Sequence, residues 1–194
     1  MNEKIGSAAR PLILASQSPR RKEILEKLGL TFSVCPAKSE VAIDGSLPLC
    51  EAVKAVARAK AEEIAAENPG KAVLGADTVV AIGETVLGKP RDEADAEAML
   101  RALSGREHRV VTAVWVVDET GRGHGFASDN RVTFAPLSDK DIDEYVATGE
   151  PMDKAGAYGI QGIGGQYITE ISGDFYAIMG LPCGKLRLFL REIS

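Results

Sequence analysis

Residues 12–29 read LILASQSPRRKEILEKLG, and this stretch contains the pattern of a strand, a tight turn and a helix. Leu12–Ala15 is a short apolar run of the kind found in buried strands. Ser18 is a favourable N-cap residue and Pro19 suits the first helical position. Gly29 is the residue most often found just beyond a helix C-terminus. A strand followed directly by a helix predicts a sheet covered by helices.

Patterns along the rest of the chain continue this mixture of strands and helices. Apolar runs predict strands at Thr31–Cys35, Val73–Ile82 (with an acid in its middle), Val110–Val117 and Asn130–Phe134. Helical spacing predicts helices over 49–67, from Asp92, from Ser138 and around Leu186–Leu190. Ser138 with Asp141 resembles a capping box at the start of its helix. A hairpin is predicted from Tyr167–Ile171 and Phe175–Ile178. We therefore expect an α/β or α+β fold, a mixed sheet flanked by helices.

Composition excludes several classes of protein. The 194 residues carry a formal net charge of −5, which argues against a sequence-independent binder of nucleic acid polymers. Three cysteines form no CxxC pair, and the two histidines, His108 and His124, offer little for a histidine-based metal site or triad. We expect both histidines at the surface or behind the reacting groups.

The first residues lack the apolar core of a signal peptide, and no run approaches the length of a membrane span. We expect residues 1–10 to form a disordered tail. These observations favour a cytoplasmic protein that does not bind membranes.

Three consecutive cations, Arg20, Arg21 and Lys22, follow Pro19 in the first turn of the first helix. The helix dipole disfavours cations there, so the arrangement makes sense if a multiply charged anion binds. The hydroxyls of Ser16 and Ser18 would add hydrogen bonds to phosphate oxygens. The alternative is a basic turn whose side chains are simply solvated.

Asp77 stands between two apolar strand fragments, where an unpaired carboxylate would be costly to bury. Use as a metal ligand or as a general base would explain it. The alternatives are an exposed strand end, or a carboxylate that bonds its own backbone.

Two glycine-containing segments add candidates. Residues 83–90 match GxxxxGK, but Pro90 replaces the required Ser or Thr and no helix follows at once, so we reject a P-loop and keep Lys89 as a phosphate contact. Residues 155–165 contain five glycines, and we expect a loop that exposes its backbone to a ligand. Within this loop, Gln161 offers both a donor and an acceptor to the edge of a base.

At these same residues the chain resembles the Maf family of nucleotide pyrophosphatases. The matching motifs run in family order over nearly the whole chain from Leu12. They are LASQSPRR (14–21), GADTVV (75–80), GKPRD (88–92), LSGREHRVVTAV (103–114), GEPMDKAGAYGIQG (149–162) and GLP (180–182).

The resemblance implies a hydrolase of nucleoside triphosphates that depends on a divalent metal, Mg or Mn, and cleaves the α–β phosphoanhydride. It implies an elongated fold akin to the inosine-triphosphate pyrophosphatases, and a homodimer. Residues 11–194 would form a single catalytic domain with two lobes around a central cleft.

The resemblance also implies roles for individual residues. Arg20, Thr78 and Gln161 fit the members that act on dTTP and UTP, whereas the 7-methyl-GTP group resembles SPWR at the first position. Lys60 fits a family lysine on the long helix, and Glu40 is the candidate for a second metal-binding acid beside Asp77. Thymine and uracil share one Watson–Crick edge, which a glutamine amide can read.

The expected mechanism combines these residues. Arg20, Arg21, Lys60 and Lys89 neutralise the triphosphate, and Asp77 serves as proton acceptor for water or as metal ligand; the sequence leaves both roles open. Two other functions stay open as well. They are hydrolysis of 7-methyl-GTP, and a nucleotide-binding regulator of cell division without turnover.

Overall fold

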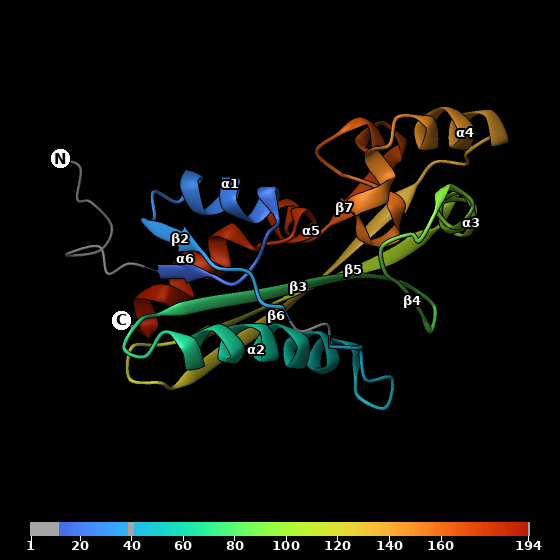
Figure 1. Cartoon of the computed structure of the whole chain (residues 1–194). Coiled ribbons are helices and arrows are strands. Elements are labelled where there is room, and N and C mark those ends of the chain that lie inside the picture. Colours follow the sequence, from blue (N-terminus) through green and yellow to red (C-terminus); the bar gives the residue numbers. More distant parts are fainter. Residues whose placement is uncertain (1–11, 39–40, 194) are drawn as a thin grey trace. The chain divides into compact units, whose positions relative to one another are not determined.

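The computed structural model describes residues 12–38 and 41–193, and Figure 1 shows the elements in chain order. The predicted tail of residues 1–10 and the candidate acid Glu40 lie outside the described residues. The strands are β1 (Leu12–Leu14), β2 (Phe32–Val34), β3 (Val73–Ile82), β4 (Thr85–Leu87), β5 (Glu107–Val117), β6 (Gly123–Phe134) and β7 (Ile168–Ser172).

Six α-helices and three short 3₁₀ turns accompany these strands in the described part of the chain. The helices are α1 (Pro19–Lys27), α2 (Leu49–Glu67), α3 (Glu93–Leu103), α4 (Asp139–Ala147), α5 (Phe175–Met179) and α6 (Cys183–Glu192). The 3₁₀ turns are η1 (Glu150–Asp153), η2 (Ala155–Ala157) and η3 (Ile163–Tyr167).

The strands form a mixed sheet in the order β2-β1-β3-β5-β6-β7, and β4 pairs with β3. β1 is parallel to both β2 and β3, with Ile13 opposite Val73, whereas β6 and β7 are antiparallel, with Val132 opposite Ile171. The predicted α/β class, a mixed sheet flanked by helices, is confirmed.

The chain divides into two compact units. The first comprises the described residues up to Asp77, Thr112–Ala127 and the described residues from Gly180 onward. The second comprises Thr78–Val111 and Ser128–Met179. The boundary between the units runs through β3, β5 and β6. Asp77 and Thr78 are therefore neighbours in β3 but belong to different units.

The first unit has a core of aliphatic side chains, among them Ile13, Ile64, Val73 and Val117. Figure 1 shows α2 running alongside the first part of β3. This approach depends on Gly75, because a Cβ there would lie 2.4 Å from the backbone oxygen of Ala57. Helix and strand backbones can pack this closely only where one of them lacks a side chain.

An aromatic cluster lies in the core of the second unit. Phe134 and Tyr158 pack edge to face with ring centroids 4.7 Å apart, and the ring of His108 packs against both. His108 Nε2 is 2.8 Å from the Tyr158 hydroxyl, and only 3% of the histidine is exposed. His108 is therefore a core residue, so of the two predicted locations the surface is wrong for this histidine.

Sequence signals at the helix N-termini are confirmed. Ser18 caps α1 and Asp92 caps α3, each accepting a hydrogen bond from a backbone N–H of the first turn. Ser138 and Asp141 form the reciprocal bonds of a capping box at α4. These caps satisfy backbone donors that have no partner within the helix.

The predicted hairpin is wrong in its second half, because Phe175–Met179 forms α5. The carboxylate of Asp174 accepts hydrogen bonds from the N–H groups of Tyr176 and Ala177, and this capping begins a helix.

The glycine-rich segment also differs from the expectation. Residues 156–160 are buried, and only the part around Gln161–Ile163 is exposed.

Candidate functional site

A basic turn and an ion pair come together in the first unit. Ser16 and Ser18 lie in the turn between β1 and α1, and Arg20 and Arg21 lie in the first turn of α1. The first turn of α1 contains no acidic residue. The predicted strand–turn–helix therefore places the cations at a helix N-terminus, where backbone N–H groups favour anions.

Arg21 is held in place by its own side-chain contacts. Its Nη1 donates to Oγ of Ser16 at 3.0 Å, and its Nε donates to the carbonyl oxygen of Gly180 at 3.0 Å. Ser16 Oγ also accepts a hydrogen bond from the N–H of Ser18 at 3.2 Å. These bonds fix the orientation of the guanidinium before any ligand binds.

The electrostatic surroundings of Arg21 suit a bound anion. Burial lowers the pKa of the guanidinium, the negative charge of Asp77 opposes this shift, and the positive charge of Arg20 adds to it. Arginine keeps its charge in proteins, so Arg21 is a partly buried cation beside a second cation. A bound anion would offset the cost of burying the guanidinium charge, and it would reduce the repulsion between the two arginines.

Asp77 is paired rather than isolated. Lys60 Nζ on α2 lies 2.5 Å from Asp77 Oδ1 on β3, and the two side chains are 24% and 17% exposed. This partner resolves the cost of a buried acid in a strand. It also brings the predicted lysine and the predicted acid into one small cluster with Arg21.

The donor set around Asp77 fits a divalent cation of the magnesium type. Among residues 12–38 and 41–193, no group of three or more His, Cys, Asp or Glu side chains gathers. Magnesium is usually bound through one or two carboxylates, with substrate phosphates and water as the other ligands. Asp77 offers one partly exposed carboxylate in the same unit as the basic turn, which fits that kind of binding.

Three predicted site residues lie in the second unit. Thr78 follows Asp77 in β3 and is half-buried, whereas Lys89 and Gln161 are exposed on loops. The N–H of Gly156 donates to the carbonyl oxygen of Gly88 at 3.0 Å, so the Lys89 loop and the glycine-rich segment are joined. The turn at Gly83 leads into β4 and not into a helix, in agreement with the rejection of a P-loop.

Two further residues, one in each unit, hold predicted site residues or their loop in place, and the sequence did not indicate them. The carbonyl of Gly180 orients Arg21, although the two residues are far apart in the chain. Glu150 accepts hydrogen bonds from the backbone N–H groups of Ile163 and Gly164, beyond Gln161. An acid followed by a run of glycines is a weak signal for such bonding, because it shows available N–H groups without showing where they point.

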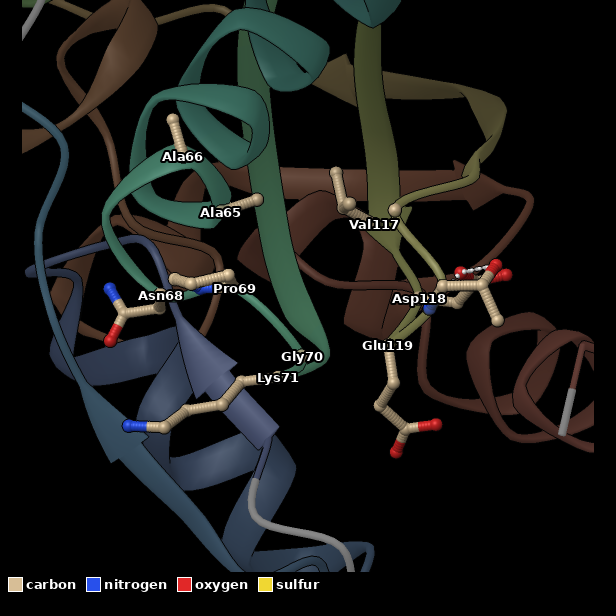
Figure 2. A pocket seen from close by; sticks show the side chains of 11 residues that line it. Ala65, Ala66, Asn68, Pro69, Gly70, Lys71, Val117, Asp118 and Glu119 are labelled. Carbon is tan, nitrogen blue, oxygen red and sulfur yellow. Dashed lines mark hydrogen bonds between the residues drawn. The ribbon is translucent and has the colours of Figure 1, made fainter.

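A hollow of about 290 Å³ also lies in the first unit, between the turn after α2 and the turn after β5. Figure 2 shows the side chains of Lys71 and Glu119 extending from these two turns. The hollow includes none of the predicted site residues. The hydroxyl of Thr120 and further donors lower the pKa of Asp118 to about 2, so this carboxylate serves the turn itself.

No helix in the described ranges is both long and apolar enough to cross a membrane. Cys35, Cys50 and Cys183 form no disulfide bond in the structure.

Comparisons with known proteins agree with the motifs. A family model described as Maf-like protein matches residues 11–193. The dTTP/UTP pyrophosphatase of Bacillus velezensis is 48% identical over 183 residues, covering 94% of this chain and 96% of the relative. The dTTP/UTP pyrophosphatase of Symbiobacterium thermophilum is 51% identical over 186 residues, covering 94% of each chain.

The fold is shared with a more distant solved structure. A HAM1 protein from Coxiella burnetii aligns over 94% of this chain and 98% of its own, with a TM-score of 0.54 and 17% identity. At that identity the likeness concerns the fold alone. The family match over almost the entire chain, together with the relatives near 50% identity, shows that the chain belongs to the Maf family.

Proposed function

We propose that this protein hydrolyses dTTP and UTP to the nucleoside monophosphate and pyrophosphate. The observation that carries the proposal is the cluster of Arg21, Lys60 and Asp77, in which two cations lie beside one carboxylate. The names of the relatives from Bacillus velezensis and Symbiobacterium thermophilum support the pyrimidine substrates over 7-methyl-GTP and over a regulator without turnover.

The basic turn binds the triphosphate. Arg20 and Arg21 offer guanidinium groups, and the hydroxyl oxygens of Ser16 and Ser18 already accept hydrogen bonds from the chain itself. Because those bonds use the oxygens as acceptors, the hydroxyl protons remain to be donated to phosphate oxygens. Lys89 adds a further positive charge from its exposed loop.

Asp77 accepts the proton of the water that attacks the α-phosphorus. Lys60 keeps the carboxylate in one orientation, so little rearrangement is needed when the proton moves. Asp77, with Glu40 as a second acid, would hold Mg or Mn. When bound, such a cation supplies positive charge to the phosphate oxygens and acidifies a bound water.

Selectivity for the base depends on other residues. Gln161 pairs its amide with the shared edge of thymine and uracil, and Arg20 and Thr78 complete the preference for these nucleotides.

Residues 11–194 act as one catalytic domain. The homodimer and the cytoplasmic location remain predictions, and light scattering on the purified protein tests the first of them.

A panel of triphosphates tests the activity. With Mg or Mn present, we expect equimolar monophosphate and pyrophosphate from dTTP and UTP. In ¹⁸O-labelled water, the label should appear in the monophosphate, because attack at the α-phosphorus adds the water oxygen there. Release of inorganic phosphate, product from 7-methyl-GTP alone, or binding without product would each contradict the proposal.

Asp77→Asn tests the role of the carboxylate. The amide keeps an oxygen ligand but cannot accept the proton, so kcat should fall at least about 100-fold. Asp129→Asn is the matched control, since it disrupts the pair of Asp129 with Arg109 in the second unit and should leave kcat unchanged. If excess Mn restores Asp77→Asn, the residue is a metal ligand and not the base.

A further inference from the structure

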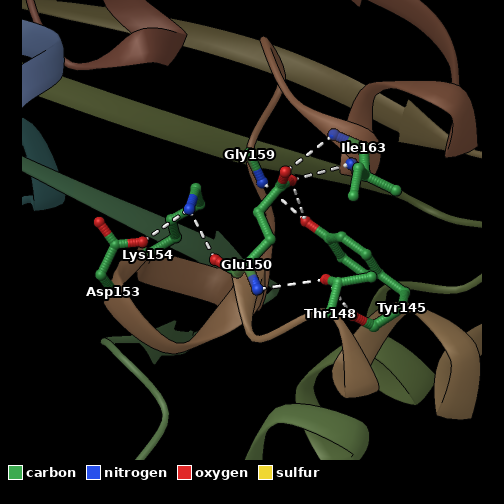
Figure 3. A network of polar contacts seen from close by, with 8 residues as sticks. Tyr145, Thr148, Glu150, Asp153, Lys154, Gly159 and Ile163 are labelled. Atoms are coloured by element: carbon green, nitrogen blue, oxygen red, sulfur yellow. Dashed lines mark hydrogen bonds and ion pairs between the residues drawn. The ribbon is translucent and has the colours of Figure 1, made fainter.

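One carboxylate organises the loop that carries Gln161. Figure 3 shows Glu150 pointing from η1 toward this loop, with dashed contacts to Tyr145 and to the backbone beside Ile163. All of these groups belong to the second unit. The contacts lie on both sides of Gln161 in the chain, so they determine where the loop is held.

Glu150 uses both of its carboxylate oxygens. Oε1 accepts hydrogen bonds from the hydroxyl of Tyr145 at 2.8 Å and from the N–H of Gly164 at 3.0 Å. Oε2 accepts from the N–H of Ile163 at 2.9 Å. The two backbone donors attach the carboxylate to the loop at the second and third residues after Gln161, and the third donor is the tyrosine hydroxyl.

Tyr145 extends the same network to the other side of Gln161. Its hydroxyl donates to Glu150 and accepts from the N–H of Gly159 at 3.1 Å. Burial raises the pKa of this tyrosine, with the carboxylate of Glu150 adding to the shift, so its hydroxyl keeps the proton that it donates. The loop is thus fastened two residues before Gln161 and again two residues after it.

The glycines of the loop make this closure possible. A Cβ at Gly162 would lie 2.3 Å from Oε2 of Glu150, and one at Gly164 would lie 2.4 Å from the hydroxyl of Tyr145. Side chains at these positions would push the carboxylate and the phenol away from the loop. The glycines next to Gln161 therefore allow contact with the chain's own acid.

The backbone of Glu150 is fastened as well. Its N–H donates to Oγ1 of Thr148 at 3.2 Å, and Lys154 Nζ donates to its carbonyl oxygen at 2.6 Å. Lys154 also pairs with Asp153.

The hydrogen bonds also affect the pKa of the Glu150 carboxyl. Burial raises this pKa, but the hydrogen bonds from the N–H groups of Gly164 and Ile163 and from the Tyr145 hydroxyl lower it by more, and the net shift is downward.

Since the loop is held at both sides of an exposed glutamine, we propose that Glu150 is a positioning residue that sets the preference of this protein for dTTP and UTP. The proposal rests on the proposed function. Glu150 acts through the loop and through Gln161, and has no part in bond cleavage. Its loss should weaken recognition of the base more than it slows the reaction.

Glu150→Gln is the sharpest test, because it keeps the size of the side chain and replaces one accepting oxygen by an amide donor. That donor must face either the Ile163 N–H, or the Tyr145 hydroxyl and the Gly164 N–H, so at least one contact is lost. We expect KM for dTTP and UTP to rise about tenfold while kcat changes little, since one lost hydrogen bond corresponds to about that factor. The preference for dTTP over CTP should fall by a similar factor.

Hydrogen exchange provides a readout that is independent of turnover. The amides of Ile163 and Gly164 should exchange faster in Glu150→Gln than in the unchanged protein. Glu84→Gln is the matched control: this acid is exposed on the turn before β4, and the substitution removes the same charge without touching the loop. Its exchange and kinetics should stay unchanged.

Tyr145→Phe is a second variant that keeps the buried ring. It removes only the hydroxyl between Glu150 and Gly159, so it tests the network even if Glu150→Gln fails to fold. Unchanged exchange in both variants would overturn the positioning role, and faster exchange with unchanged preference would overturn its link to the base. An unchanged protein that cannot hydrolyse dTTP would contradict the proposed function, while the exchange data would still decide whether Glu150 holds the loop.

Discussion

Asp77 is the residue on which the proposed hydrolysis depends most directly. An acid inside an apolar strand indicated either a paired or a functional carboxylate, and the structure pairs it with Lys60. The sequence alone left an exposed strand end as an alternative. Pairing was not predictable from local pattern, since the two residues are 17 positions apart and belong to a helix and a strand.

His108 leads to a prediction about stability and pH. Burial lowers its pKa from 6.5 to about 4 in the folded protein. Between these two values the unfolded chain binds a proton that the folded chain does not, so stability falls as the pH drops from about 6.5 to 4. Between pH 7 and pH 5 this loss should be about 2 kcal/mol.

Urea unfolding at pH 7 and pH 5 measures this effect. His108→Gln lacks the titrating ring and keeps a side chain that can hydrogen-bond with Tyr158. The variant should lose less stability than the unchanged protein over this range, and the difference isolates His108 from the carboxylates. Equal losses in the two proteins would mean that the buried ring does not stay neutral.

At the scale of the elements, the local sequence was informative about helices. The helix predicted over 49–67 has the observed bounds of α2, and the capping signals at Ser18, Asp92 and Ser138 are confirmed. Such signals act over three or four residues and need no tertiary contact. The predicted hairpin is wrong because Asp174 caps the first turn of α5, and a short apolar run such as Phe175–Ile178 does not by itself distinguish a strand from a helix.

Gly75 provides a prediction about the contact between α2 and β3. A Cβ there would lie 2.4 Å from the oxygen of Ala57 and 2.8 Å from the nitrogen of Ala61. Both atoms belong to the backbone of α2, on either side of Lys60. Gly75→Ala must therefore displace α2, and with it the lysine that pairs with Asp77. We expect about 1–3 kcal/mol of destabilisation by overpacking, and a loss of kcat.

Gly184→Ala is the control for this substitution. A Cβ at Gly184 meets nothing within 4 Å, and the residue lies in α6. Alanine in a helix should stabilise the protein by about 0.5–1 kcal/mol. Thermal unfolding and dTTP turnover measure both variants, and an unimpaired Gly75→Ala protein would show that the close approach of α2 is unnecessary.

At the scale of the whole molecule, net charge predicts which anions bind. The formal charge of −5 is spread over 194 residues, whereas Arg20, Arg21 and Lys60 act at one place. A polymer must approach a protein whose net charge is negative, while a single triphosphate meets mainly the local cations.

Separate binding measurements with a nucleotide and with a polymer test this expectation. In the Asp77→Asn variant, dTTP should bind, and a single-stranded oligothymidylate should show no saturable binding even at low salt, as followed by fluorescence anisotropy. Adding salt should weaken dTTP binding, because it screens the charges of the basic turn. Tight binding of the oligonucleotide would refute the charge argument.

The sequence by itself determined the order of most elements, the N-termini of α1 to α4, the family and most of the candidate residues, because these depend on short patterns and on motifs in register. Tertiary structure decided which side chains meet. Arg21 reaches the carbonyl of Gly180 over 159 positions, and Glu150 reaches past Gln161 to Gly164. Such contacts arise where packed elements bring distant segments within hydrogen-bond distance, and a pattern of neighbouring residues does not contain that geometry.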